Sequence, residues 1–160
     1  MEVMEKSPDV HEEQMVIFQL SGQTYGVGIS SVYEIIRMET ITRVPRTPHF
    51  VEGVINLRGR IIPVIDLCKR LGLEDMGRSG ASRIIIVDVG GQVIGIIVDS
   101  VSEVLRVPAD TVEPPPPIVH GIEAAYLKGI AILGERLIIL LDLNKILFEE
   151  EVEELKDFCA

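Results

Sequence analysis

Residues 53–71 read Gly-Val-Ile-Asn-Leu-Arg-Gly-Arg-Ile-Ile-Pro-Val-Ile-Asp-Leu-Cys-Lys-Arg-Leu. Residues 129–147 repeat this stretch in related form, as Gly-Ile-Ala-Ile-Leu-Gly-Glu-Arg-Leu-Ile-Ile-Leu-Leu-Asp-Leu-Asn-Lys-Ile-Leu. This repeat decides the fold. The two stretches align without a gap. Identical residues stand at several of the matched positions, among them Gly53 and Gly129, Leu57 and Leu133, Arg60 and Arg136, Asp66 and Asp142, Lys69 and Lys145, and Leu71 and Leu147. In each stretch two apolar runs flank a glycine-containing turn, which is the pattern of a β-hairpin. The aspartate that follows suits the N-cap of a short helix.

The segments before these two stretches repeat as well. The matched positions are Gly22-Gln23 with Gly91-Gln92, Gly26 with Gly95, Ser31-Val32 with Ser100-Val101, Glu34 with Glu103, and Arg37 with Arg106. A repeat of this length predicts a duplicated structural unit. Since each unit holds about five short runs typical of strands, the chain is expected to be mainly β and to form two small β-barrels.

Composition along the chain suggests where the units begin and end. Residues 1–13 are acidic and polar and are expected to form a flexible arm. The first repeat unit is expected at about residues 14–71 and the second at about residues 83–147. The glycine- and serine-containing segment 72–82 is the expected linker.

The C-terminal part is expected to be helical. Asp142 is a suitable N-cap, and the helix is expected to continue through the acidic tail at residues 149–160. Apolar residues recur there at helical spacing, at Phe148, Val152, Leu155 and Phe158, so the helix should pack on the body. A further helix start is expected at Thr47-Pro48, and the apolar pattern around residues 32–37 fits either a helix turn or a strand.

Charge and composition exclude several classes of protein. The 160 residues carry a net charge of −10, concentrated in the two ends. The local basic excess in residues 37–70 contains few aromatic side chains, which argues against a nucleic-acid platform. No apolar run is long enough to span a membrane, and the acidic N-terminus is unlike a signal peptide, so a cytoplasmic protein is expected.

No pattern in the sequence predicts catalysis or a cofactor. The cysteines (Cys68 and Cys159) and the scattered histidines lie in no metal-ligand spacing, and Cys68 is expected to be a buried apolar residue. The repeated Asp66 and Asp142 could suggest an acid dyad, but each is followed by leucine and is explained by helix capping. The glycines of residues 90–95 fit a hairpin rather than a phosphate loop.

The remaining candidate is the hairpin tip Asn56-Leu57-Arg58-Gly59-Arg60. A guanidinium at a tip can face a partner, although an ordinary solvated charge is an equally simple explanation. The second unit has Gly134 in place of Arg58, so this arginine is not needed to build the unit.

The stretch from Val44 to Leu67, with its Asn-Leu-Arg-Gly and Pro-Val-Ile-Asp-Leu motifs, resembles the signature of the CheW family of chemotaxis coupling proteins. The resemblance covers about residues 14–148 and includes both Gly-Gln hairpins. The same signature occurs in the regulatory domain of the CheA kinase and in the N-terminal domain of CheV. A stand-alone coupling protein is expected, because this chain is too short for a kinase and leaves no room for a receiver domain.

The resemblance implies a fold, partners and candidate sites. It implies two SH3-like five-stranded barrels, intertwined around a shared core, and a non-enzymatic scaffold that binds both the cytoplasmic tip of methyl-accepting chemoreceptors and the CheA regulatory domain. The residues it implies for receptor binding are Arg58, Glu34, Val32, Asn56, Gly95 and Val104. Those it implies for kinase binding are Ile41, Val44, Val51 and Gly53. The alternatives are a kinase-regulatory module without receptor coupling, or a small β-barrel that binds a ligand.

Overall fold

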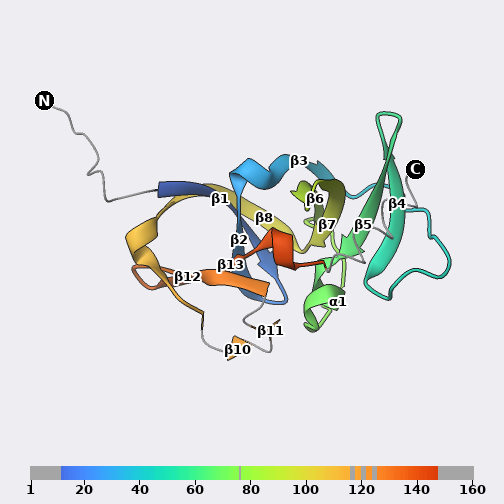
Figure 1. The fold of residues 1–160 in the computed structure, drawn as a ribbon. Helices are drawn as coiled ribbons and strands as arrows, with labels where there is room; N and C mark the ends of the chain where they lie inside the picture. Colours follow the sequence, from blue (N-terminus) through green and yellow to red (C-terminus); the bar gives the residue numbers. More distant parts are fainter. Residues whose placement is uncertain (1–11, 76, 116–117, 120–121, 124–125, 148–160) are drawn as a thin grey trace, which may run out of the picture.

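The computed structural model describes residues 12–75, 77–115, 118–119, 122–123 and 126–147, and this part of the chain is mainly β (Figure 1). One sheet has six strands in the order β8-β1-β2-β13-β12-β9, and the other has five in the order β3-β6-β7-β5-β4. The strands of the six-stranded sheet are β1 (Glu12–Leu20), β2 (Gln23–Gly28), β8 (Ser100–Pro108), β9 (Val112–Glu113), β12 (Leu127–Leu133) and β13 (Arg136–Leu141). Those of the five-stranded sheet are β3 (Val32–Arg37), β4 (Val51–Leu57), β5 (Arg60–Asp66), β6 (Arg83–Val89) and β7 (Gln92–Val98).

Helix is scarce in the described residues. The α-helix α1 (Leu67–Leu71) has Asp66 as its N-cap, whose carboxylate accepts a hydrogen bond from the Lys69 backbone N–H, and Gly72 ends it in the left-handed conformation. The remaining elements are the 3-10 turns η1 (Ile29–Ser31), η2 (Ala109–Thr111) and η4 (Leu143–Lys145) and the small sheet of β10 (Ile118–Val119) and β11 (Ile122–Glu123).

Each sheet combines strands from both halves of the sequence. The β1–β2 hairpin pairs with β8 and with β13, whereas the β6–β7 hairpin pairs with β3 and with β5. The two halves of the sequence meet at two pairings in each sheet, the antiparallel β1–β8 and parallel β2–β13 in one, and the antiparallel β3–β6 and parallel β5–β7 in the other. The mixed sheets therefore require both halves of the chain.

The repeated glycines allow close approach of a preceding segment in both halves. A Cβ on Gly53, which has φ +147°, would lie 2.1 Å from the Thr42 carbonyl oxygen, and one on Gly129 would lie 2.8 Å from the Glu113 oxygen. Both glycines follow a register shift in their hairpins. In the first half the approaching segment forms the isolated bridge from Thr42 to Val54.

The six strands of one sheet correct the expectation of five in each unit. The additional strand is β9, which pairs with Ile130 and Ala131 of β12. Because Val54 aligns with Ile130 in the repeat, the single Thr42–Val54 bridge is the counterpart of β9 in the first half. The sequence pattern did not reveal β9 because two residues followed by a proline run carry no strand periodicity.

Three clusters of buried apolar residues hold the sheets together. The central cluster lies between the two halves and includes Phe18, Tyr25, Ile65, Ile85 and Leu141. Two satellite clusters lie on the opposite faces, around Ile55 and Ile84 in the five-stranded sheet and around Ile17 and Ile138 in the six-stranded sheet. Both sheets are thus covered by apolar side chains on both faces.

Several boundaries differ from the expectations. β1 begins at Glu12, so the last two residues of the expected arm (12 and 13) belong to a strand, because they pair with Pro108 and Val107 of β8. The segment 32–37 is a strand. No helix begins at Thr47-Pro48, where the described chain makes turns before β4. Asp142 caps η4, and the expected continuation of this helix from residue 148 lies outside the described residues.

Candidate functional site

The β4–β5 hairpin tip is built by its own sequence. Arg58 (φ 52°) and Gly59 (φ 85°) both have positive φ, as the tightest hairpin turns require. The Asn56 side-chain oxygen accepts a hydrogen bond from the Gly59 backbone N–H at 2.8 Å. Asn56 therefore shapes the turn, and the turn directs Arg58 away from its own strands.

Arg58 forms a forked ion pair with Glu34 of β3. Nη1 donates to Oε2 at 2.8 Å and Nη2 donates to Oε1 at 2.7 Å, while the Arg58 side chain remains 69% exposed and that of Glu34 33% exposed. The hydrogen bonds from Arg58 lower the pKa of Glu34, and Glu34 in turn raises that of Arg58. The sequence predicted both residues for the same site, and the structure brings them into direct contact.

This ion pair shows that the five-stranded sheet is strongly curled. β3 and β4 lie at its opposite edges, which in a flat sheet would be about 19 Å apart. The 2.7 Å contact between Arg58 and Glu34 is possible only if the two edges approach each other. The six-stranded sheet has a counterpart, in which Arg136 Nη2 donates to Glu103 Oε2 at 3.0 Å.

The edge strands β3 and β8 carry a matched set of aliphatic residues on the face of the central cluster. Val32 and Val101 are half-buried against this cluster. Ile35 lies opposite Ile85, and Val104 lies opposite Val16, so both project on the same face as these core residues. Ile35 is 38% exposed and Val104 49% exposed. We call Val32, Ile35, Val101 and Val104 the aliphatic strip.

Only two members of the aliphatic strip were predicted from the sequence. Val32 and Val104 were predicted as receptor-binding residues, whereas Ile35 and Val101 were missed. The repeat itself contained the signal, because Val32 aligns with Val101, and Ile35 aligns with Val104. When a residue is predicted as a binding residue in one repeat unit, the aligned residue in the other unit is a candidate as well.

Gly95, which the sequence predicted to bind the receptor, lies inside the five-stranded sheet. It is buried in β7, and a Cβ at this position would lie 2.7 Å from Ile84 and 3.5 Å from Val64, both in the satellite cluster. Gly95 thus permits the close packing of the five-stranded sheet.

The predicted kinase-binding residues divide into two half-buried and two buried positions. Ile41 and Val44 lie half-buried in the segment between β3 and β4, residues 38–50, which we call the connector. Val51 is buried in the central cluster, and Gly53 is buried beneath the Thr42 carbonyl. Of these four residues, only Ile41 and Val44 can present side-chain surface to a partner.

A network of charges ties the linker to β4 and α1. The largely buried Glu52 carboxylate accepts hydrogen bonds from Lys69 at 2.8 Å and from Arg78 at 3.0 Å, and Arg78 also lies 3.5 Å from Asp66. Burial alone would raise the pKa of Glu52, but the hydrogen bonds from Lys69 and Arg78 and their charges outweigh burial, so the net shift is downward. This network fixes the segment between the two halves.

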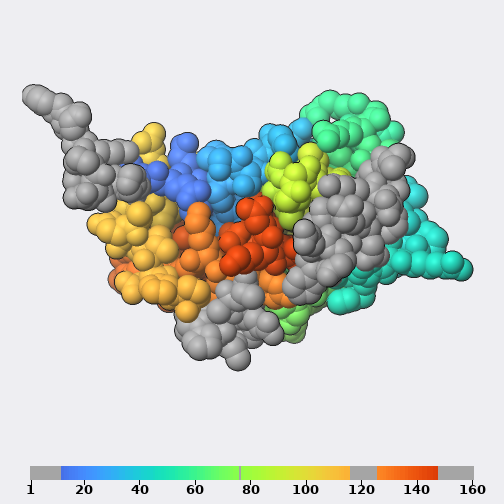
Figure 2. Space-filling view, viewed as in Figure 1, coloured from blue at the N-terminus to red at the C-terminus, as the bar shows by residue number. Residues whose placement is uncertain are grey.

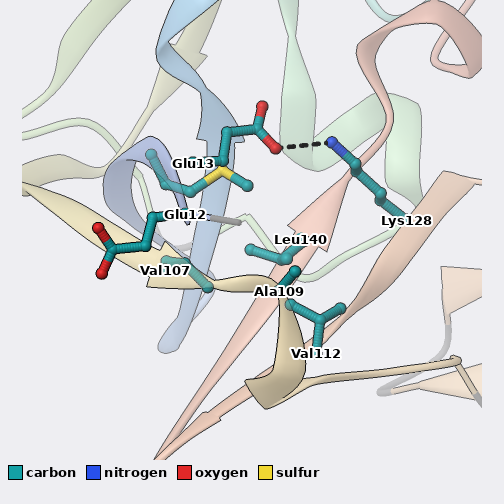
Figure 3. A pocket seen from close by; sticks show the side chains of 8 residues that line it. Glu12, Glu13, Val107, Ala109, Val112, Lys128 and Leu140 are labelled. Carbon is teal, nitrogen blue, oxygen red and sulfur yellow. Dashed lines mark hydrogen bonds and ion pairs between the residues drawn. The ribbon is translucent and has the colours of Figure 1, made fainter. Parts of the chain in front are cut away.

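A cavity of about 340 Å³ opens at one end of the six-stranded sheet (Figure 3). Its wall is mostly apolar, with Met15, Val107, Val112 and Leu140 among its residues. At its rim Lys128 donates to Glu13 Oε1 at 3.0 Å (Figure 3). No nucleophile or acid–base pair converges on it from the described residues that line it, so this cavity has the features of an apolar contact site.

Neither a metal centre nor a membrane span is found in the described residues. Nowhere in this part of the chain do three or more His, Cys, Asp or Glu side chains gather in a way that could hold a metal ion. No helix of the described chain is long and apolar enough to cross a membrane. Cys68 is buried as predicted, and burial together with the negative charge of Asp99 raises the pKa of its thiol to about 12.

Comparisons with known proteins agree with this geometry. The model of the CheW-like domain matches residues 14–151. The chain is 38% identical over 140 residues to the chemotaxis protein CheW of Klebsiella aerogenes, covering 88% of this chain and 84% of that protein. It is 36% identical over 146 residues to the chemotaxis protein CheW of Thermotoga maritima, covering 89% and 93%.

A solved structure shares the fold. The scaffolding protein TtCheW from Thermoanaerobacter tengcongensis superimposes with a TM-score of 0.82 at 43% identity, covering 88% of this chain and 96% of that one. Sequence and fold therefore agree over nearly the whole length of both proteins. This chain belongs to the CheW-like domain family of chemotaxis scaffolding proteins.

Proposed function

We propose that this protein is a non-enzymatic scaffold that couples chemoreceptors to the CheA histidine kinase by binding both. The observation that carries the proposal is the exposed Arg58–Glu34 fork, at a family signature in a chain that matches chemotaxis CheW proteins over most of its length. In this role the protein works in the cytoplasm, attached to membrane receptors through its partners.

The receptor surface in this proposal combines the fork with the aliphatic strip. Arg58, Glu34 and the turn-forming Asn56 supply orienting charges, and Val32 and Val104 supply apolar area. A helical-hairpin tip with aliphatic and charged side chains suits this combination, because protein interfaces join an apolar centre to a polar rim. Glu34 already occupies the Arg58 fork, so a receptor carboxylate has to share or displace it.

The kinase surface in this proposal is the connector. Ile41 and Val44 present its partly exposed apolar area, and Thr42 holds it against β4 through the Val54 bridge. A segment fixed at both ends loses little conformational entropy on binding, which favours affinity.

We also propose the finer description of the fold. The two units, at about residues 14–71 and 83–147, would form two SH3-like barrels that exchange their first hairpins. Two contacts support curling of the sheets towards closure: Arg58–Glu34, from the β4–β5 tip to the opposite edge strand β3, and Arg136–Glu103, from the start of β13 to the edge strand β8.

Separate binding measurements test this function. The protein is titrated by calorimetry with a chemoreceptor signalling tip and, independently, with a CheA regulatory domain. The proposal expects binding to both. Binding to the kinase domain alone would identify a kinase-regulatory module, and a melting temperature raised by a small molecule, with neither partner bound, would identify a ligand-binding protein.

A further inference from the structure

The connector presents basic side chains to solvent. Arg43 and Arg46 are both exposed, and Arg46 sits in a turn with φ 64°. Within the described residues neither guanidinium has a carboxylate partner, and Glu39 is the one acidic residue of the connector itself. In Figure 2 the connector (turquoise) forms the far right corner of the molecule.

The described chain ends beside this connector. Ile146 and Leu147 are buried in the central cluster. Arg70 Nε donates a hydrogen bond to the Ile146 carbonyl, and its guanidinium lies 4.7 Å from the centre of the Phe50 ring. Since Phe50 is the last residue of the connector, one arginine side chain spans the distance from the connector to the point where residues 148–160 begin.

The sequence of residues 148–160 is complementary to this surface. It contains six acidic residues and Lys156, and its apolar residues Phe148, Val152, Leu155 and Phe158 follow helical spacing. A helix of this segment is about 20 Å long. Thr42 pairs with Val54, which lies three residues along β4 from Val51, a distance of about 10 Å. The helix is longer than this distance, so the whole connector lies within its reach.

We propose that the acidic C-terminal segment folds back onto the connector as an amphipathic helix. Its apolar side covers Ile41 and Val44, and its carboxylates lie near Arg43 and Arg46. Docking there is autoinhibitory, and this part of the inference depends on the proposed function, because the connector is also the proposed kinase surface. Tail and kinase then compete for one surface.

The other acidic end of the chain offers a matched control. β1, which follows residues 1–11, starts at the opposite end of the molecule from β4 (Figure 1). Glu13, near that start, pairs with Lys128 rather than with the connector. Neutralising Glu2, Glu5 and Asp9 therefore changes the net charge without altering a segment that begins beside the connector.

The docked tail is detected through Cys159. A nitroxide reagent modifies Cys159 selectively, because Cys68 is buried and its thiol stays protonated. The inference expects the label to broaden the amide NMR signals of Ile41 to Thr47 in the full-length protein. It expects this broadening to disappear in the Arg43→Glu/Arg46→Glu variant. Connector signals that are unaffected by the label in the unsubstituted protein would overturn the inference.

A second measurement separates this inference from the proposed function. Replacing the six tail carboxylates by their amides should increase affinity for the CheA regulatory domain about tenfold, if the tail covers the connector nine-tenths of the time. The Glu2→Gln/Glu5→Gln/Asp9→Asn variant should leave this affinity unchanged. If the NMR result shows a docked tail but the affinity for the CheA regulatory domain does not change, tail and kinase do not compete, and the kinase binds another surface. No kinase binding by any variant would contradict the proposed function, while the NMR result would still stand on its own.

Discussion

At the scale of single residues, two short hydrogen bonds from Arg58 to Glu34 join the β4–β5 hairpin tip to the edge strand β3. The sequence singled out Arg58 because a guanidinium at a hairpin tip can face a partner, and the structure shows its two hydrogen bonds to Glu34. The bond itself was not predictable, because the residues are separated by 24 positions and meet only when the sheet curls. The family position of Gly95 placed it in the receptor site, and the structure shows this glycine packed against Ile84.

Replacing Arg58 should impair function without unfolding the protein. Arg58→Ala removes an exposed side chain, and exposed ion pairs contribute little to stability. The expected results are an unchanged thermal unfolding midpoint and weaker receptor-dependent activation of CheA autophosphorylation. Arg58→Lys should recover only part of the activation, since an ammonium cannot form the fork. The matched control is Arg136→Ala, which removes the counterpart pair with Glu103. Normal activation by Arg58→Ala would refute the assigned role.

The same fork should be visible in the titration of Glu34. Hydrogen bonding by Arg58 lowers the pKa of this carboxyl group. In Arg58→Ala the pKa of Glu34 should therefore rise towards that of an ordinary glutamate, as measured by carbon NMR of the side-chain carboxyl. An identical titration curve in both proteins would show that the ion pair does not form in solution.

At the scale of elements, the hairpins were predictable and their partners were not. The glycine turns and apolar runs located the β4–β5 and β12–β13 hairpins, and aspartate followed by leucine located the caps of α1 and η4. Pro63 cannot donate a hydrogen bond to a neighbouring strand, and the β5–β7 pairing begins only at the next residue, Val64. Exchange of hairpins between the sheets depends on contacts between distant segments, which leave no local pattern.

Gly53 should be far less tolerant of substitution than Gly59. In Gly53→Ala the new Cβ would meet the Thr42 carbonyl at 2.1 Å from a backbone with positive φ, which should cost about 3 kcal/mol or more of unfolding free energy. Gly59 also has positive φ but no atom within 4 Å of an added Cβ, so Gly59→Ala should cost about 1 kcal/mol. Urea unfolding of the two variants measures this, and equal losses would contradict the close approach of the connector to β4.

The linker network should make stability depend on acid through Glu52. Its pKa is lowered in the folded protein, so its stabilising contribution is complete above the unfolded value of about 4.3. It is lost as the pH falls through the lower folded value. The difference in unfolding free energy between the unsubstituted protein and Glu52→Gln should therefore be greatest near neutral pH and shrink below about pH 4. Urea unfolding across this range tests it, and a difference that grew towards acid would have the wrong sign.

At the scale of the whole molecule, the two mixed sheets share one apolar cluster and carry distinct surfaces. The hairpin tip and the aliphatic strip belong to β3, β4 and β8, whereas the connector lies on the other side of the β4 bulge. The sequence predicted two related units and a scaffold from a specific motif. It could not show which candidate residues remain exposed, because the burial of Val51 and Gly95 depends on contacts with distant segments.

Coupling requires that both surfaces be occupied at once, and one measurement tests this directly. A chemoreceptor signalling tip is immobilised, and retention of a CheA regulatory domain is measured with and without this protein. The account predicts retention only when the protein is present, and strongly reduced retention with Arg58→Ala. If receptor tip and kinase domain instead displaced each other from the protein, its surfaces would overlap and the coupling function would be contradicted.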